Sequence, residues 1–328
     1  MSSILITVVV LGLVFSFLNG VHDSSNVVAT MISSRAFSPG VALGATALAN
    51  FLAPFMFGLA VAETIGNDVV TSSSINMTVI VASLASAILW NLATWYLGFP
   101  SSSSHALVGG IIGAVLIDGG WNAIKLPGLT KILVTLLTSP LLGFLFGFII
   151  LKILVILSWN ASPKINEWFK HSQIVTGVAL ALSHGANDAE KTMGIITLGL
   201  VIGGYLKVFS VPFWVIISCA SAIALGTAIG GWRLIKTLGG KIFRIRPIDG
   251  FTSQLASAMI IIVASLIGGP VSTTQVVSTS IMGTGTAERA NKVRWGVAQE
   301  IATAWLLTIP ASALVAAGIY EVLIRVIR

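Results

Sequence analysis

The chain carries few charged residues for its length, and this scarcity limits what kind of protein it can be. Only 9% of its 328 residues are charged, against 55% that are apolar, and the mean hydropathy is +0.98. Such segments cannot cover themselves with a water-facing polar surface, which excludes a soluble globular protein. The longest polar interludes, residues 158–172 and 232–250, are short enough to be loops. We therefore expect an integral protein of the cytoplasmic membrane with no soluble domain.

Other features that the sequence lacks exclude further classes of protein. A single cysteine, Cys219, excludes an internal disulfide, and its apolar neighbours predict a packing role. The N-terminus has neither a basic region nor an A-x-A-like cleavage site, so we expect a retained first helix instead of a signal peptide. Ten-residue alternation of polar and apolar positions is also missing, which argues against a porin-type barrel. Apolar stretches of about 20 residues predict a bundle of membrane-spanning helices.

The positive charge that the chain does have lies at membrane boundaries. The net charge is +7. Five of the basic residues crowd one segment: Arg233, Lys236, Lys241, Arg244 and Arg246. Cytoplasmic loops of membrane proteins are rich in lysine and arginine, so we expect this segment on the cytoplasmic side. The basic balance therefore indicates a lipid bilayer as partner and no nucleic acid.

The sequence repeats itself in two halves. Four motifs recur in the same order, 165 to 173 positions further on: NGVHDSSN and HGANDAEK, GLAVAETIG and GWRLIKTLG, GFPSSSSH and GGPVSTTQ, LLTSP and LLTIP. Membrane transporters are often built from two such copies. We expect an N-terminal transmembrane repeat over residues 1–158, a cytoplasmic linker over 159–171 and a C-terminal transmembrane repeat over 172–328.

Charge predicts that the two halves have opposite orientations in the membrane. The first copy of the second motif contains or precedes two acids, Glu63 and Asp68, and no base, whereas the basic cluster accompanies the other copy. The positive-inside rule then places the copies on opposite sides, as inverted repeats. We expect an all-α polytopic protein of about 12 membrane segments, some of them re-entrant helical hairpins.

Each half carries one aspartate at membrane depth. Asp23 and Asp188 occupy equivalent places in the first motif, each three residues after a glycine, Gly20 or Gly185. An aspartate at a helix centre costs about 2.5–3.5 kcal/mol on insertion scales, so it persists mainly where it faces an internal site. The glycines allow the helix to unwind, which frees carbonyls for a cation, or allow a neighbour to approach closely. A hydrogen bond between helices is the structural alternative for either aspartate.

The third motif predicts a helix N-terminus at the tip of a hairpin. Its copies, Pro-Ser-Ser-Ser-Ser at 100–104 and Pro-Val-Ser-Thr-Thr at 270–274, place a proline where one helical segment stops and the first turn of the next begins. The free N–H groups and the positive dipole end of a helix N-terminus favour an anion. The apolar pieces around the first copy, 79–97 and 106–116, are unequal, and the second is too short to cross alone. Serines that let helices pack closely are the structural alternative.

Together the two motifs predict an anion and a cation in one site. Two helix N-termini with hydroxyl groups suit a tetrahedral oxyanion, and two carboxylates flanked by amides suit small hard cations. The membrane potential opposes entry of an anion by about 2.3 kcal/mol per charge per 100 mV, and co-transported cations cancel this cost. These features predict a secondary active symporter, not an enzyme, with no cofactor besides the co-transported ion.

The same motifs resemble those of the PiT family of inorganic phosphate transporters. The family's duplicated signature is similar to G-A-N-D-V-A-N, and GVHDSSN from Gly20 and GANDAEK from Gly185 resemble it. Its second motif is similar to G-x-P-x-S-T-T-H, which GFPSSSSH and GGPVSTTQ resemble, and the similarity extends over nearly the whole chain. The resemblance implies a symporter of inverted repeats that imports inorganic phosphate with sodium or protons, as a homodimer.

The resemblance also implies the residues of the site. Those expected around phosphate are Ser102, Ser103, Ser104, Ser272, Thr273, Thr274, Asn26 and Asn187. Those expected around sodium are Asp23, Asn26, Asn187, Asp188, Ser104 and Thr274. The chain departs from the family pattern at three places: His22 replaces an asparagine, Lys191 replaces the last asparagine and Gln275 replaces a histidine. These departures bear on the equivalence of the two halves and on the number of cation sites.

The driving ion has two candidates. His22, His105 and His184 lie in or beside the motifs, and chains of carboxylates and histidines serve as proton relays. Amide and hydroxyl oxygens outnumber titratable groups in the motifs, however, so we favour sodium. A proton-coupled symporter of phosphate, metal-phosphate or sulfate is the alternative. Two other classes are a passive anion channel and an intramembrane metalloenzyme with His22, Asp23, His184 and Asp188 as ligands.

Overall fold

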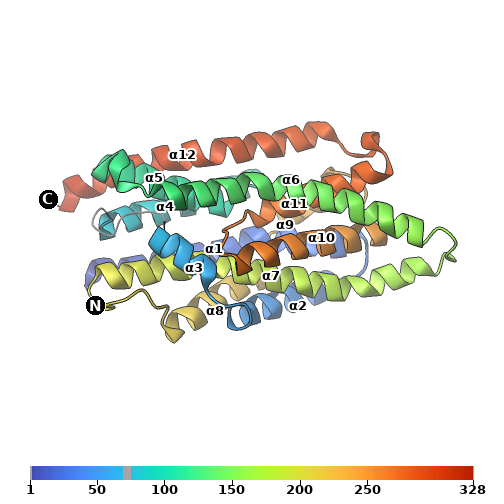
Figure 1. Cartoon of the computed structure of the whole chain (residues 1–328), viewed down its shortest axis with the longest axis horizontal. Helices are drawn as coiled ribbons and strands as arrows, with labels where there is room; N and C mark the ends of the chain where they lie inside the picture. The colour runs from blue at the N-terminus through green and yellow to red at the C-terminus, as the bar shows by residue number, and fades with distance from the viewer. Residues whose placement is uncertain (1, 69–74, 328) are drawn as a thin grey trace.

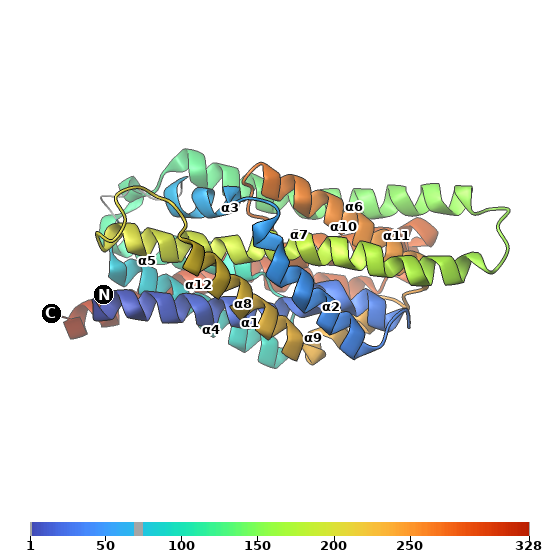
Figure 2. The same ribbon diagram turned by 90° about the horizontal axis from the view of Figure 1, so that it is seen from below.

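A computed structural model of the chain describes residues 2–68 and 75–327. Within these ranges the regular elements are all helices, which confirms the expected fold class. Figures 1 and 2 show a long bundle in which most helices run along one common direction. Both chain termini lie at one end of the bundle, and the connection 158–164 lies at the other.

The helices follow one another in the same order twice. The first series comprises α1 (Ser3–Ser33), α2 (Pro39–Leu52), a 3-10 turn (Ala53–Phe55), α3 (Ala60–Glu63) with a π-helical turn (Thr64–Asp68), α4 (Met77–Leu97), α5 (Ser103–Gly119), a 3-10 turn (Trp121–Ala123) and α6 (Leu126–Leu157). The second comprises α7 (Ile165–Ile202), α8 (Phe213–Ile229), α9 (Trp232–Lys236) with a π-helical turn (Thr237–Lys241), α10 (Pro247–Leu266), α11 (Thr273–Glu288), a 3-10 turn (Ala290–Lys292) and α12 (Trp295–Ile327). In Figure 1, α1 starts at the end of the bundle that holds the N-terminus, and α7 starts at the opposite end.

Two segments that we expected to be loops are partly helical. α7 begins at Ile165, so the connection 158–164 is shorter than the predicted linker 159–171. Residues 232–241 form α9 and its π-helical turn, with Leu234 and Ile235 buried and Arg233 and Lys236 exposed. The basic side chains hide the helical spacing of these apolar residues, which is why the segment was predicted as a loop. The Asp68 side chain, used in the charge comparison, lies outside the described part of the chain.

The long outer helices have the surface expected of lipid contact. Among the described helices, α1, α4, α6, α10 and α12 are long and apolar enough to cross a membrane, and the bent pairs α2–α3 (69°) and α8–α9 (58°) raise the number from five to seven. In the most apolar window of α6 only 17% of residues are buried, and in α12 22%, against 67% in α10. α6 and α12 therefore lie outermost, while α10 is enclosed by other helices. The expected number of about 12 membrane segments stays a prediction.

Two helical hairpins, α4–α5 and α10–α11, have the same construction. α4 ends at Gly98 and α10 ends just before Gly268, whose φ angles of 75° and 69° lie in the left-handed region that glycine adopts readily. Pro100 and Pro270 lie in the segments that follow, two residues before the N-caps of α5 and α11, and not in the first helical turn as expected. Each hairpin helix packs on the other series, because α5 lies along α12 and α11 along α6. The two halves are thus interlocked.

The glycines that precede the aspartates permit close helix crossings. α1 and α7 continue through both motifs without a break, so the unwinding considered from the sequence is wrong. A Cβ atom on Gly20 would lie 2.2 Å from the carbonyl oxygen of Ile223, and one on Gly226 would lie 2.0 Å from that of Phe17. α1 and α8 therefore cross with their backbones in contact. This crossing fixes the position of the first aspartate relative to the second half.

The α1–α8 crossing can be tested by adding one methyl group. Gly226→Ala is expected to lower the melting temperature of the purified protein by several degrees, because overpacking costs about 1–3 kcal/mol. Gly44→Ala on α2, where a Cβ meets no atom within 4 Å, is the matched control and should melt like the wild type or slightly higher. Equal melting temperatures for the two variants would contradict a close crossing.

Candidate substrate and cation site

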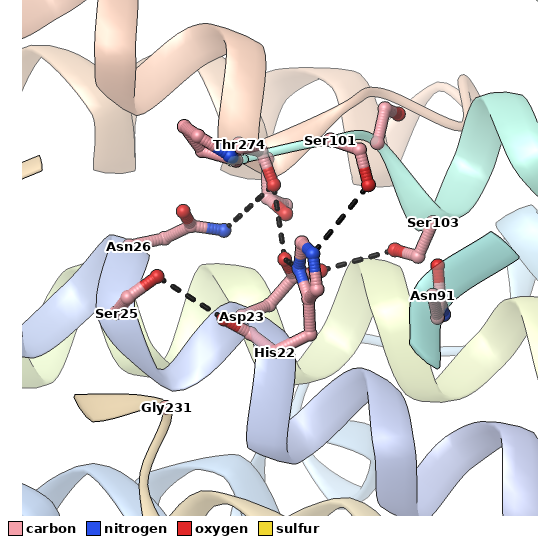
Figure 3. Close-up of polar contacts among 12 residues, drawn as sticks. His22, Asp23, Ser25, Asn26, Asn91, Ser101, Ser103, Gly231 and Thr274 are labelled. Atoms are coloured by element: carbon pink, nitrogen blue, oxygen red, sulfur yellow. Dashed lines mark hydrogen bonds and ion pairs between the residues drawn. The ribbon is translucent and has the colours of Figure 1, made fainter. Parts of the chain in front are cut away.

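The two aspartate motifs and the two hairpin tips meet in the interior of the bundle. Asp23 on α1 and Asp188 on α7 are fully buried. One ligand atom each of Asp23, Asp188 and His184 lie within 4.8 Å of one another. The N-terminal turns of α5 and α11 approach this cluster, one from each hairpin, and Figure 3 shows their side chains around Asp23. The structure therefore brings together the groups that the sequence predicted as a single site.

Asp23 links the two hairpins. Its Oδ2 accepts a hydrogen bond from the Ser103 hydroxyl at 3.0 Å, and its Oδ1 accepts one from Thr274 Oγ1 at 2.9 Å. Ser103 begins α5 of the first series, whereas Thr274 lies in the first turn of α11 of the second series. The neighbouring His22 Nδ1 lies 2.9 Å from Oδ1. One carboxylate thus fixes both hairpin tips relative to α1.

Asp188 has a similar set of partners with one addition. Its Oδ2 accepts a hydrogen bond from Thr273 Oγ1 at 3.0 Å and lies 2.9 Å from His184 Nε2. Its Oδ1 contacts the ammonium of Lys191, one helical turn further along α7. Each aspartate therefore has a hydroxyl partner from a hairpin tip and a histidine partner from its own helix, but only Asp188 is paired with a lysine among the described residues.

Lys191 connects α7 to both hairpin tips. Besides Asp188, its Nζ donates to Ser104 Oγ at 2.6 Å and to the Val271 carbonyl oxygen at 2.8 Å. The side chain is 1% exposed. The three protons of the ammonium are thus matched by three oxygen acceptors. From the sequence, this lysine was identified as a departure from the family pattern, and no role was predicted for it.

The six predicted serine and threonine residues all lie at the hairpin tips, but they do different things. Ser102 and Ser272 are the N-caps of α5 and α11, where their Oγ atoms accept from the third residue onward, His105 N at 3.1 Å and Gln275 N at 3.3 Å. Ser104 Oγ also donates to the carbonyl oxygen of Val271 at 2.9 Å, which joins the two tips. Only the residues after each N-cap contact the charged groups directly.

The two predicted asparagines differ in availability. Asn26 Nδ2 donates to Thr274 Oγ1 at 3.0 Å, and its buried Oδ1 has no hydrogen-bond partner within the described ranges. Asn187 Nδ2 donates to Ser265 Oγ at 3.0 Å and to the Gly269 carbonyl at 3.2 Å, while its Oδ1 accepts from Val271 N at 3.3 Å. Asn187 therefore holds the α10–α11 hairpin in place, whereas Asn26 has an acceptor free for a ligand.

Two further residues, which were not predicted as site residues, also support the cluster. Glu190, buried on α7, accepts hydrogen bonds from the backbone N–H groups of Val61 at 2.8 Å and Ala62 at 3.4 Å, which anchors α3. Asn50 of α2 places its Oδ1 3.3 Å from His184 Nδ1. Glu190 could have been identified from the sequence, because it is a second acid in the same motif, two residues after Asp188. Asn50, a polar residue in an apolar segment, is a candidate for a hydrogen bond between helices, but its partner is 134 positions away and could not be identified from the local sequence.

Comparison with known proteins places this geometry in a family. The model of the phosphate transporter family matches residues 19–316. The chain belongs to that family. A probable low-affinity inorganic phosphate transporter of Rhizobium meliloti is 43% identical over 97% of this chain and 96% of its own length. One with the same description from Bacillus subtilis is 42% identical over 97% and 96%. Membership confirms a multi-pass membrane transporter and rules out the metalloenzyme alternative.

A solved structure extends the match to three dimensions. The structure described as the sodium-dependent phosphate transporter superposes with a TM-score of 0.92 at 26% identity, covering 98% of this chain and 99% of its own. The helical arrangement described above is therefore that of a transporter across its full length. His22, which we had considered as a metal ligand, is not in the group of Asp23, His184 and Asp188 that converge on one point.

The anchoring role of Asn187 can be tested by hydrogen exchange. Asn187→Ala removes three hydrogen bonds to the α10–α11 hairpin, each worth about 1 kcal/mol. Amide exchange in residues 268–275 should accelerate by about tenfold or more, as measured by mass spectrometry. The control is Asn91→Ala, another buried asparagine, whose amide has no hydrogen-bond partner in the described part of the chain. Asn91→Ala should leave exchange in that segment unchanged. If exchange does not accelerate in Asn187→Ala either, the anchoring role of Asn187 is contradicted.

Proposed function

We propose that this chain imports inorganic phosphate across the cytoplasmic membrane by symport with sodium. The observation that carries the proposal is the convergence of two hairpin N-termini and two aspartates in one buried cluster. Helix N-termini favour an oxyanion and carboxylates favour cations, so the cluster has affinity for both charges at once. Two relatives are described as probable inorganic phosphate transporters and the similar solved structure as a sodium-dependent phosphate transporter, which agrees with this assignment.

Phosphate is proposed to bind between the first turns of α5 and α11. The first N–H groups of each helix have no carbonyl partner within the helix, and the helix dipole adds a positive potential at this end. Ser103 and Thr273 place a hydroxyl beside each of these turns. The predicted phosphate residues are retained in this proposal: Ser102, Ser103, Ser104, Ser272, Thr273, Thr274, Asn26 and Asn187. Ser102, Ser272 and Asn187 act in it by shaping the tips.

Sodium is proposed to bind at the aspartates. Around Asp23 the structure offers carboxylate oxygens and the Thr274 hydroxyl, which are hard oxygen ligands, and the neighbouring Asn26 has a buried Oδ1 without a hydrogen-bond partner in the described ranges. The predicted sodium residues Asp188, Asn187 and Ser104 lie in the same cluster. A cation at this place offsets the repulsion between the carboxylates and an incoming oxyanion. Each ligand then binds better in the presence of the other, which is the coupling that a symporter needs.

We propose that movement of the two halves relative to each other opens the site to either side of the membrane. Residues 1–158 and 172–328 have the same order of helices, and their first helices start from opposite ends of the bundle. This arrangement supports inverted repeats, which rock around a central site in many transporters. The homodimer implied by the family resemblance is retained as part of the proposal, since the exposed apolar faces of α6 and α12 suit a second copy or lipid.

Proton coupling is a second candidate because each aspartate contacts a histidine. His22 Nδ1 lies 2.9 Å from Asp23, and His184 Nε2 lies 2.9 Å from Asp188. Carboxylate–histidine pairs inside membranes serve as proton relays. Sodium is favoured because the hydroxyl, amide and carbonyl oxygens around these pairs outnumber the titratable groups and are ligands for a metal cation.

Separate ion gradients distinguish the two driving ions. In proteoliposomes containing the purified protein, an inward sodium gradient at equal pH should raise the initial uptake of radiolabelled phosphate several-fold over equal sodium. A pH gradient in sodium-free buffer should leave uptake at the level of protein-free vesicles. The reverse result would establish proton coupling. Uptake that follows the phosphate gradient alone, with no effect of either ion, would indicate a passive channel.

The aspartates are expected to be essential for driven uptake. Asp23→Asn and Asp188→Asn each remove a carboxylate charge from the cluster, and charge-assisted interactions are worth about 1.5–3 kcal/mol, so uptake should fall by at least tenfold. Asp118→Asn, on the exposed end of α5, is the matched control and should retain uptake close to that of the wild type. Phosphate uptake driven normally in both cluster variants would refute the proposal.

A further inference from the structure

At one mirrored position beside the aspartates, the second half of the site carries a positive charge that the first half lacks. When GVHDSSN and GANDAEK are aligned, Asp23 corresponds to Asp188 and Asn26 corresponds to Lys191. When the hairpin motifs are aligned, Ser104 corresponds to Thr274. The same backbone position therefore carries a neutral amide in the first half and an ammonium in the second.

The contacts at this position show what the ammonium replaces. In the first half the aspartate and the opposing tip touch directly, because Thr274 Oγ1 donates to Asp23 at 2.9 Å. In the second half the mirrored partners, Asp188 and Ser104, are both bound to the ammonium of Lys191, which lies between them. The ammonium thus occupies the space between a carboxylate and a hairpin tip that is the mirror image of the proposed sodium position.

The ligands of the Lys191 ammonium are those of a small hard cation. They are a carboxylate oxygen, a hydroxyl oxygen and a backbone carbonyl oxygen, from Asp188, Ser104 and Val271. Lysine and aspartate are almost never fully buried unless they are paired, and both side chains are buried here. All three protons of this buried ammonium are bound by oxygen atoms, which are the ligand type that a small hard cation takes. Together they form a cation-binding shell drawn from α7, α5 and the α10–α11 hairpin.

We propose that Lys191 is a tethered cation that permanently fills the second cation position of the site. This inference rests on the proposed function and refines it: the second half contributes its positive charge from the protein, so only the Asp23 position exchanges an ion with the solution. The formal charge of Asp23, Asp188 and Lys191 together is −1, and one sodium ion neutralises it. The chain then moves one cation fewer per phosphate than a relative with an amide at both mirrored positions.

Equilibrium binding of radioactive sodium to the purified protein tests the proposal. Lys191→Asn gives the second half the residue that the first half has at Asn26. It should bind one sodium ion more per chain than the wild type, and the dependence of phosphate uptake on sodium should become steeper. Lys131→Asn removes another lysine, on α6 outside the cluster, and should leave the sodium count unchanged. An equal count for Lys191→Asn and the wild type, or an equal increase in both variants, would overturn the proposal.

If the melting curve of Lys191→Asn shows that this variant does not fold, the reciprocal variant provides the test. Asn26→Lys introduces an ammonium at the first position and should bind one sodium ion fewer than the wild type. An unchanged count in folded Asn26→Lys protein would contradict a cation position beside Asp23 and its mirror at Lys191. The wild-type count separates the two proposals. Absence of sodium binding in the wild type refutes sodium coupling, whereas the difference between variant and wild type tests the tethered cation.

Discussion

The need to satisfy two buried carboxylates inside a membrane is the constraint on which the rest of the structure depends. Each aspartate costs about 2.5–3.5 kcal/mol on insertion scales, and there is no water at that depth to donate hydrogen bonds. Asp23 is satisfied by donors from both hairpins, so neither half can provide its environment alone. The interlocked packing of α5 on α12 and of α11 on α6 brings those donors into place. Fold and site therefore stabilise each other.

In the proposed mechanism the same donors account for the coupling of ion and anion binding. In the structure the hydroxyls of Ser103 and Thr273 donate to Asp23 and Asp188. A sodium ion bound at Asp23 lowers the negative charge that attracts the Ser103 hydroxyl. That hydroxyl is then free, with the N–H groups of the first helical turns, to donate to an oxyanion between the tips. Thr273 keeps its hydrogen bond to Asp188, to which the Lys191 ammonium is already bound. Coupling in the proposed mechanism thus follows from competition for a limited number of hydrogen-bond donors.

The sequence predicted the helical class and which groups would lie together, because the relevant groups are consecutive in the chain. The hydroxyls at 102–104 and 272–274 and the repeated aspartates can be read locally, and the structure brings them together. Contacts between distant segments were not predictable. Lys191 binds Ser104, 87 positions away, and no local pattern indicates such a partner. Gly20 permits both an unwound helix and a close crossing, and only the neighbouring backbone of Ile223 decides between them.

The two halves have the same order of helices, but their side chains at mirrored positions need not have the same chemistry. His22 and Asn187 occupy mirrored positions. Both reach the segment around a hairpin entry, since His22 Nε2 lies 3.4 Å from Ser101 Oγ and Asn187 binds the backbone of Val271. An amide and an imidazole both supply hydrogen-bonding groups for this support. Lys191 is the corresponding specialisation of the second half. The halves share the order of their helices, and in the proposed mechanism the choice and number of transported cations depend on the side chains that differ between mirrored positions.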